Sequence, residues 1–304
     1  MDKTIELNSG RITKVQWSAD GRLLAAPTES GSTILFDFET KEVVRKLGPH
    51  AGCVTAVAWD VKAECILTGS LDGSIGLWKV SNGERAPFTI DGHRTPVHSI
   101  EWTDEEAYAI TCSPDRLRVL DGACLLPGWE KETEDSINEH SDFTAAACSH
   151  RTTFLLALAA GKGKLLRLVS LLYGTVLSSV TFESSVRALA WSPVEDLLAV
   201  GSDVGILLFR CTQDGFEGVP RQLSQGKATH VRALAFSGDG KLLASADDEA
   251  INIWGLDRQK PTASFENAQK FSESEPVSGI AFHPSRPLIA ATGSPNTAVR
   301  FLEV

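Results

Sequence analysis

The sequence predicts an all-β protein made of seven similar units, whose sheets pack side by side around a common axis. An aromatic or cysteine residue ends an apolar run at spacings of 42, 43, 46, 43, 45 and 46 residues. The runs are short, rich in Val, Ile and Phe, and bounded by turns, as strands are. No segment between turns has the i, i+3, i+4, i+7 spacing of an amphipathic helix. One small sheet cannot bury both of its faces, whereas radially stacked sheets bury them against one another.

The first strand of each unit ends at the recurring anchor residue. These strands read ITKVQW, VTAVAW, VHSIEW, FTAAAC, VRALAW, VRALAF and VSGIAF, and they end at Trp17, Trp59, Trp102, Cys148, Trp191, Phe236 and Phe282. Four residues follow each anchor, as in SADG or SGDG, and most of these segments are typical of tight turns.

Two further apolar runs follow each turn at nearly fixed offsets. The second strands begin near residues 23, 65, 108, 154, 197, 242 and 288. The third strands read TILFDF, SIGLWKV, LRVLDG, LLRLVSL, GILLFR, AINIWGL and AVRFLEV. Each unit of about 43 residues therefore predicts two hairpins, or four antiparallel strands.

The stretch LTGSLDGSIGLWKV, residues 67–80, resembles the repeat of the WD-repeat (tryptophan–aspartate repeat) β-propeller family, which is about 40–45 residues long. The resemblance covers the chain and implies one domain over residues 1–304, a seven-bladed β-propeller of four-stranded antiparallel blades. In this family a His, a Ser or Thr, an Asp and a Trp form a buried hydrogen-bond chain within the blade. The resemblance assigns these roles to His50, Asp72 and Trp78, with Ser70 or Thr68 as the hydroxyl.

The other units keep only part of this pattern. The sixth unit has Asp248 and Trp254, whereas the third has His93 and Asp115 but Leu120 at the Trp position. Only the second unit is therefore expected to contain the complete hydrogen-bond chain. Apolar packing is expected to hold the other blades.

The last unit ends after its third strand, at VRFLEV, so its fourth strand must come from elsewhere in the chain. Residues 3–7, KTIEL, alternate like a strand. In the family that the chain resembles, the N-terminal segment supplies the missing outer strand. We therefore expect residues 3–7 to complete the seventh blade and to close the ring.

Composition and charge narrow the possible functions. The net charge of −10 argues against broad binding to nucleic acid or to anionic membranes. No apolar run reaches the ~20 residues of a membrane-spanning helix, and the first residues lack the apolar core of a signal peptide. The six cysteines include no Cys-x-x-Cys pair, so reduced thiols are expected. A cytoplasmic protein fits these features, with the nucleus as an alternative.

The sequence predicts no catalytic residue, no cofactor and no metal site. His93 and His98 are five residues apart, but no further ligands stand at matching positions. Residues 161–164, GKGK, lack the P-loop pattern and predict a turn between the second and third strands of the fourth unit. Hydrolase, zinc-protease and dinucleotide-binding motifs are absent. An enzyme whose site combines residues of distant blades at the channel mouth is an alternative.

The second residue of each first strand is expected at the mouth of the central channel. These residues are Thr13, Thr55, His98, Thr144, Arg187, Arg232 and Ser278. The connection before the sixth unit adds Arg221, Lys227 and His230, and the acidic connection before the fourth unit adds Trp129. The ring predicts a binding face that is cationic near the fifth and sixth blades. A scatter of solvated charges is the alternative interpretation.

Loops on a rigid scaffold are typical binding sites, so the sequence favours a non-enzymatic protein–protein interaction module or scaffold subunit. We expect a partner to present an acidic peptide segment to Arg187 and Arg232, with His98 extending the site. Alternatively, both arginines pair with acidic residues of the protein itself, such as Glu183 or Glu195. A ligand-sensing or regulatory subunit that acts with a separate effector is a further alternative.

Overall fold

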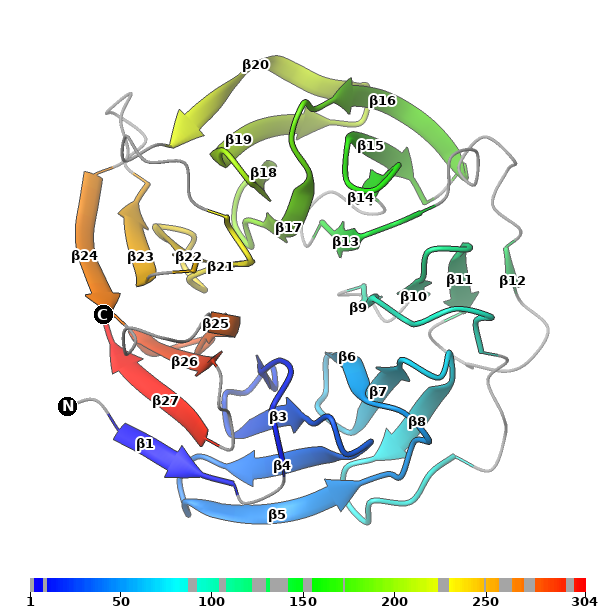
Figure 1. Ribbon diagram of the computed structural model, residues 1–304, viewed down its shortest axis with the longest axis vertical. Helices are drawn as coiled ribbons and strands as arrows, with labels where there is room; N and C mark the ends of the chain where they lie inside the picture. The colour runs from blue at the N-terminus through cyan, green and yellow to red at the C-terminus, as the bar shows by residue number, and fades with distance from the viewer. Residues whose placement is uncertain are drawn as a thin grey trace.

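The computed structural model describes most of the chain as strands arranged in a ring (Figure 1). The described residues are 3–7, 10–86, 92–103, 108–121, 130–131, 142–149, 155–171, 173–223, 230–248, 250–256, 264–270, 277–293 and 298–304. No helix occurs within these ranges. The strands form seven antiparallel sheets, which are the blades of a seven-bladed propeller.

The innermost strand of each blade is the one that the recurring anchor predicts, and each of these strands ends at its anchor. They are β2 (Gln16–Trp17), β6 (Val54–Trp59), β9 (Ser99–Trp102), β13 (Ala145–Cys148), β17 (Val186–Trp191), β21 (Ala233–Phe236) and β25 (Val277–Phe282). The predicted repeat is therefore confirmed in each blade.

The second strand of each blade follows after a tight turn, and the third strand pairs with the second. The second strands are β3 (Leu23–Pro27), β7 (Cys65–Ser70), β10 (Tyr108–Cys112), β14 (Leu155–Ala160), β18 (Leu197–Ser202), β22 (Leu242–Ala246) and β26 (Leu288–Gly293). The third strands are β4 (Thr33–Asp37), β8 (Ile75–Lys79), β11 (Leu117–Asp121), β15 (Leu165–Ser170), β19 (Gly205–Thr212), β23 (Ala250–Gly255) and β27 (Ala298–Glu303).

An outer strand is present in six of the seven sheets. The outer strands are β5 (Glu42–Leu47), β12 (Glu130–Lys131), β16 (Thr175–Thr181), β20 (Gly215–Leu223), β24 (Ser264–Lys270) and, in the seventh blade, β1 (Lys3–Glu6). Within the described residues the second blade has three strands rather than the predicted four, because the residues after its third strand contribute only a bridge between Trp78 and Arg85.

Strand β1 pairs antiparallel with β27, with Lys3 opposite Phe301 and Glu6 opposite Ala298 (Figure 1). The two strands lie at opposite ends of the sequence. Leu7, just after β1, is buried in an apolar cluster that contains residues of the first and seventh blades.

The buried apolar residues of the described chain form seven clusters, and each cluster lies between two neighbouring blades. We call each of these interfaces a seam. The cluster between the first two blades, for example, combines Leu35 of β4 with Trp59 of β6 and Ile66 of β7. The core is therefore distributed around the ring, as the radial stacking of two-faced sheets requires.

Three of the Trp anchors also connect neighbouring blades through their indole N–H groups. Trp17 donates to the backbone carbonyl of Ala281 at 3.3 Å, and Trp59 donates to that of Gln16 at 3.2 Å. Trp191 donates to the carbonyl of Ala147 at 2.8 Å. Each acceptor immediately precedes the anchor of the preceding blade, so the anchors stabilise seams as well as blades.

Glycine residues in two turns bring one blade close to the chain segment that enters the next blade. Gly73 has φ 83°, and a Cβ atom there would lie 2.2 Å from the carbonyl oxygen of His93. Gly31 has φ 81°, and its Cβ atom would lie 2.4 Å from the carbonyl oxygen of His50. Only glycine fits both the left-handed backbone and the close approach.

Candidate functional site

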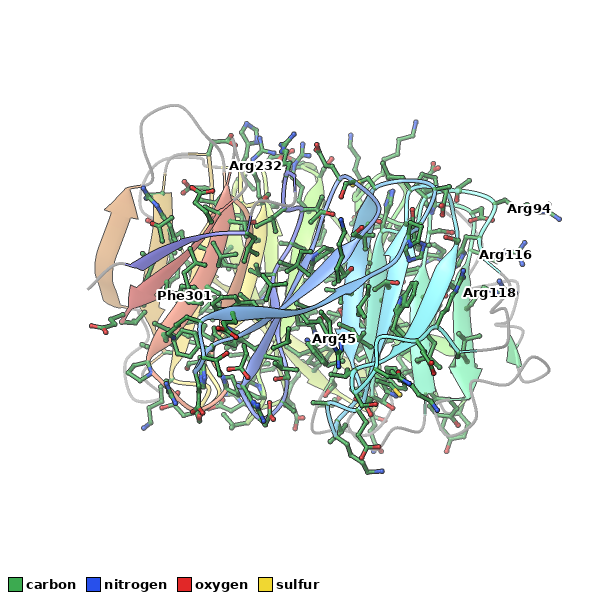
Figure 2. The ribbon with its side chains drawn as sticks, turned by 90° about the horizontal axis from the view of Figure 1, so that it is seen from below. Arg45, Arg94, Arg116, Arg118, Arg232 and Phe301 are labelled. Carbon is green, nitrogen blue, oxygen red and sulfur yellow. The ribbon has the colours of Figure 1, made fainter. Side chains whose placement is uncertain are left out.

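The predicted ring of residues lines a cavity of about 240 Å³ along the central channel. All of its members contribute: Thr13, Thr55, His98, Thr144, Arg187, Arg232 and Ser278. We call these the mouth residues. In the side view of Figure 2, Arg232 lies at one face of the disc. Each mouth residue comes just before, or near the start of, an innermost strand, which explains why all of them gather at this face.

The threonines among the mouth residues connect adjacent blades. The hydroxyl of Thr13 donates to the carbonyl of Val54 at 2.6 Å, and that of Thr55 donates to Val97 at 2.5 Å. Thr144 lies 3.3 Å from the corresponding carbonyl of Val186. These hydroxyl groups therefore have a structural role at the seams after the first, second and fourth blades.

The arginines at the same position do not make this bond. Arg187 donates from Nε to Oδ1 of Asp203 at 2.5 Å, and Arg232 donates from Nε to Oδ1 of Asp248 at 2.5 Å. Each aspartate lies in the turn between the second and third strands of the same blade. Intramolecular pairing therefore occurs, but with aspartates of these turns rather than with Glu183 or Glu195.

Both ion pairs are accessible from the solvent. The Arg187 and Arg232 side chains are 50% and 45% exposed, and those of Asp203 and Asp248 are 23% and 39% exposed. The hydrogen bond from Arg187, together with one from His230, lowers the pKa of Asp203. In turn Asp203, with a smaller contribution from Asp248 of the next blade, raises the pKa of Arg187. Arg187 therefore stays charged at the channel mouth.

The other residues predicted for the partner-binding face have different outcomes. His98 is exposed at the mouth, and the neighbouring Ser99 connects the blades there by donating to the carbonyl of Ala146 at 3.1 Å. His230 lies 3.0 Å from Oδ1 of Asp203, so it extends the Arg187 pair. Lys227 and Trp129 lie outside the described residues.

The prediction for Arg221 is wrong. It was expected at the channel mouth, but it belongs to the outer strand β20, opposite Leu208 of β19. Its Nε and Nη2 atoms are buried and have no hydrogen-bond partner within the described structure. Strand β20 is the outermost strand of the fifth blade, so the three inner strands of that blade separate Arg221 from the channel.

The second blade contains the buried hydrogen-bond chain that the resemblance implied. The Trp78 indole donates to Oγ1 of Thr68 at 2.7 Å, and Nε2 of His50 lies 2.7 Å from the same oxygen. Nδ1 of His50 lies 2.6 Å from Oγ of Ser74. Asp72 accepts hydrogen bonds from the backbone N–H groups of Ala51 at 2.8 Å, Gly52 at 3.1 Å and Ser74 at 2.8 Å.

Of the two hydroxyl groups that the sequence offered, Thr68 rather than Ser70 stands at the centre of this chain. Thr68 lies opposite Gly76, and a Cβ atom at Gly76 would lie 2.7 Å from the Trp78 indole nitrogen. The missing side chain at Gly76 therefore gives the indole access to Thr68. Ser70 lies two residues further along β7, at its end, and accepts a hydrogen bond from the Asp72 backbone at 3.2 Å.

Two family profiles match the sequence. The profile described as Anaphase-promoting complex subunit 4 WD40 domain matches residues 4–62 and 189–272, and the WD domain, G-beta repeat, matches residues 174–203. The chain belongs to the WD-repeat β-propeller family.

Curated relatives of this WD-repeat protein include cell-division proteins. "Cell division cycle 20.4, cofactor of APC complex" of Arabidopsis thaliana is 26% identical over 280 residues, which are 88% of this chain and 61% of the relative. "Anaphase-promoting complex subunit cdc20" of Dictyostelium discoideum is 25% identical over 275 residues, 86% of this chain and 52% of the relative. The chain thus spans between about half and three fifths of the length of these relatives.

Solved structures of other propellers superpose over the whole chain. The Cps50 (Swd1) beta-propeller domain of Myceliophteria thermophila has a TM-score of 0.85 at 20% identity and covers 100% of both chains. U3-55K has a TM-score of 0.83 at 13% identity, with 100% of this chain and 98% of that chain covered. At these identities the likeness shows the propeller fold alone.

The third blade of the propeller keeps more of the hydrogen-bond chain than the sequence suggested. Nε2 of His93 lies 2.8 Å from Oγ1 of Thr111, and Nδ1 lies 2.7 Å from Oγ of Ser113, which donates to Asp115. Only the Trp is missing, because Leu120 occupies its position. Burial lowers the pKa of His93 to about 4, although Asp115 opposes this shift. A partial hydrogen-bond chain therefore holds this blade in addition to apolar packing, whereas the second blade has the complete chain as expected.

In the sixth blade the Trp254 indole donates to Oγ of Ser245 at 2.9 Å. The buried aspartate of its turn is Asp247, which accepts from the backbone of Ala250 at 2.8 Å. Asp248, the aspartate that the sequence suggested, is the partner of Arg232 instead. Trp254 follows the hydroxyl residue Ser245 by nine positions, whereas Trp78 follows Thr68 by ten. The turn of the sixth blade is therefore one residue shorter, and a different aspartate faces inward.

Three cationic residues of the channel were not predicted, and one of them, Lys14, lines the cavity of the mouth residues. Arg11 and Lys162 line the upper part of the channel together with His98, Arg187 and Arg232. Lys162 lies in the predicted GKGK turn between β14 and β15, and its φ is 60°. The lysine between two glycines in this predicted turn was the available signal. No acidic side chain lines this part of the channel within the described structure.

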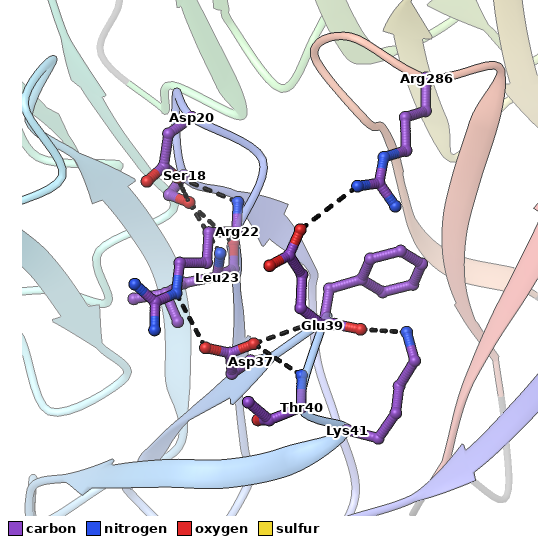
Figure 3. A network of polar contacts seen from close by, with 10 residues as sticks. Ser18, Asp20, Arg22, Leu23, Asp37, Glu39, Thr40, Lys41 and Arg286 are labelled. Carbon is purple, nitrogen blue, oxygen red and sulfur yellow. Dashed lines mark hydrogen bonds and ion pairs between the residues drawn. The ribbon is translucent and has the colours of Figure 1, made fainter.

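Charged residues on the face opposite the mouth pair with one another within the first blade and between the first and seventh blades (Figure 3). Arg22 donates to Asp37 at 2.9 Å within the first blade, and Arg286 of the seventh blade lies 3.5 Å from Glu39 of the first. Backbone hydrogen bonds from Thr40 and Glu39, together with the Arg22 contact, lower the pKa of Asp37. Arg22 and Arg286 follow the anchors of their blades, and Asp37 and Glu39 stand at the end of β4, so these residues lie at the edge of the blades away from the mouth.

The described part of the propeller contains no group of three or more His, Cys, Asp or Glu side chains placed to hold a metal ion. The cysteines within it, Cys53, Cys65, Cys112, Cys148 and Cys211, are free thiols. The same residues include no helix that could cross a membrane.

We expect Trp78→Phe to destabilise the propeller by ~1–3 kcal/mol, because it leaves Thr68 and His50 without the donor that ends their buried chain. Trp102→Phe is the matched control, since the buried Trp102 indole has no hydrogen-bond partner within the described structure. Trp129→Phe is predicted to cost less than Trp78→Phe. Urea midpoints of the three variants would rank them, and an equal loss for Trp78 and Trp102 would contradict a role for the indole hydrogen bond.

Proposed function

We propose that this protein is a non-enzymatic interaction module, which holds partners of a larger assembly against its channel-mouth face. An acidic segment of the partner contacts Arg187 and Arg232. The single observation that carries the proposal is the presence of two exposed arginines, on neighbouring blades, at positions where three other blades have a threonine that connects them to the next blade.

This exchange leaves two seams without the hydroxyl hydrogen bond that Thr13, Thr55 and Thr144 make. No hydroxyl or indole bond of the kind described above is found between the fifth and sixth blades or between the sixth and seventh, within the described residues. Proteins commonly give up stability where function requires a particular side chain. Arginine is also enriched at the energetic centres of protein interfaces. Both arguments favour a binding role for Arg187 and Arg232.

The relatives support an assembly role. Their names describe a cofactor of the APC complex and an anaphase-promoting complex subunit, and both are proteins that act within multi-protein assemblies. A rigid ring that exposes loops on a fixed scaffold suits the same task in this chain.

We expect the double substitution Arg187→Thr and Arg232→Thr to weaken partner binding roughly thirty-fold, as the loss of a ~2 kcal/mol interface contact would. The unfolding temperature should stay the same or rise, because threonine at these positions can donate to the next blade as Thr13 does. The measurement compares the proteins retained from an extract of the source cells by immobilised wild type and by the variant.

Arg210→Ala is the matched control, because Arg210 is an exposed arginine of β19 outside the channel mouth. A stoichiometric partner retained by wild type and by Arg210→Ala, but lost by the double variant, supports the proposal. Equal retention by the double variant, with an unchanged circular dichroism spectrum, would move the site away from the mouth.

We also propose that the pairing of β1 with β27 holds the ring closed. The support is the four-residue register between Lys3 and Phe301 and between Glu6 and Ala298, together with the burial of Leu7. This pairing joins segments from the two ends of the sequence without a covalent bond.

A further inference from the structure

Two chemically identical ion pairs lie side by side at the channel mouth. Arg187 and Arg232 occupy the same position in neighbouring blades, and each donates through Nε to an aspartate of its own blade at 2.5 Å. Asp248 also acts on Arg187 through space, so the two pairs are close enough to interact. Asp203, Arg187, Asp248 and Arg232 therefore form one cluster of two ion pairs across the fifth and sixth blades, which His230 joins through Asp203.

The bond through Nε fixes the direction of each guanidinium group. The terminal Nη atoms of Arg187 and Arg232 make no hydrogen bond within the described structure, although both side chains are about half exposed. A guanidinium group held in this way presents parallel N–H donors along its remaining edge. A carboxylate accepts two such hydrogen bonds at once, and this geometry is specific to arginine. Each pair therefore offers one binding position for a carboxylate.

The spacing of the blades determines how two carboxylates would have to be arranged. Strands β17 and β21 have Cα atoms within 8 Å of each other. In an extended peptide, side chains on one face recur at every second residue, ~6.5–7 Å apart. Arg187 belongs to β17 and Arg232 directly precedes β21, so side chains of peptide residues i and i+2 fall within this limit on one face of the peptide, whereas residue i+1 points to the other side.

From this match we infer that the mouth binds an extended peptide segment with two carboxylates at positions i and i+2, one for Arg187 and one for Arg232. The inference rests on the proposed function and specifies the partner segment that the site takes. A single phosphoryl group fits less well, because each guanidinium group is held toward the aspartate of its own blade rather than toward a common point.

The test uses the full chain and short Gly/Ser peptides that carry a neutral fluorophore and two glutamates. The glutamates are placed at i,i+1, at i,i+2 or at i,i+4, so that the peptides have the same charge and composition. Fluorescence anisotropy at low salt gives each affinity for wild type, Arg187→Thr, Arg232→Thr and the Arg210→Ala control. A peptide with one phosphoserine in place of both glutamates is measured in parallel.

We expect the i,i+2 peptide to bind at least five-fold tighter than the other two spacings, with each single arginine variant removing most of that advantage. Equal affinities for all spacings, no detectable binding of any diacid, or tighter binding of the phosphoserine peptide would overturn the inference. Equal affinities for all spacings, or tighter binding of the phosphoserine peptide, leave the proposed function intact if partner retention still requires both arginines. Loss of that requirement in the retention experiment would reject the proposed function itself.

Discussion

Deletion of residues 2–7 is expected to destabilise the whole propeller and to make it prone to aggregation. The deletion removes the strand that pairs with β27 from Lys3 to Glu6, together with the buried side chain of Leu7. Burial of one leucine contributes ~1.5–3 kcal/mol, and each hydrogen bond of the strand pair contributes about 1 kcal/mol. A loss of a few kcal/mol should lower the unfolding temperature by roughly 5 °C or more.

The exposed edge of β27 explains the expected aggregation. Its sequence, AVRFLE, would present unpaired backbone groups beside the apolar side chains of Val299 and Phe301. Light scattering during a thermal melt monitors this directly. Ile5→Pro should reproduce much of the loss, because Ile5 lies opposite Val299 in the pairing and proline cannot donate to it. Thr4→Ala, at an exposed position of the same strand, is the control. A truncated protein that melts within about a degree of the full chain would show that the ring does not depend on β1.

Acidification from pH 6.5 to about 4.5 should destabilise the protein through His93. The His93 side chain is fully buried, and burial lowers its pKa from 6.5 to about 4. The unfolded chain therefore takes up a proton in this range while the native chain does not. The contribution of neutral His93 to the free energy of unfolding is fully present above pH 6.5. It falls as the pH approaches the native pKa, by up to about 3 kcal/mol in total.

The variant His93→Gln should be less stable at pH 7 but should lose less further stability between pH 6.5 and 4.5. The stability of this variant should still depend on pH to some extent, because burial also lowers the pKa of His50 in the second blade. Asp72 and Asp115, whose hydrogen bonds lower their pKa values to about 2 against the cost of burial, lose their contribution only at lower pH. His98→Gln at the exposed mouth is the control. Urea midpoints of the three proteins with parallel pH profiles would exclude His93 as the origin.

The repeat itself could be predicted from the sequence, because it depends on local patterns. Short alternating apolar runs, tight turns and an anchor every 42 to 46 residues identify the innermost strands, and each predicted anchor ends such a strand. The mouth residues could also be predicted, since they occupy one fixed position in each strand and the ring places equivalent positions at the same height. Because the units repeat, residues at equivalent sequence positions lie at equivalent places around the ring.

Features that depend on how the strands and turns of a blade pack together could not be predicted. The choice of Thr68 over Ser70 depends on the empty position opposite it at Gly76. The aspartate partners of Arg187 and Arg232 depend on how each turn folds back over its own blade. Arg221 was misplaced because the outer strand continues through its position before the chain returns to the axis.

The sequence by itself therefore determined the number of blades and the residues that surround the channel. The tertiary structure decided which of those residues are occupied with holding the ring together and which point their donors to the solvent. Thr13 and Arg187 stand at equivalent positions in the repeat, but only the threonine bonds to the next blade. The physical reason is that a short hydroxyl reaches the neighbouring carbonyl, whereas a long guanidinium group extends past it to a carboxylate in its own blade.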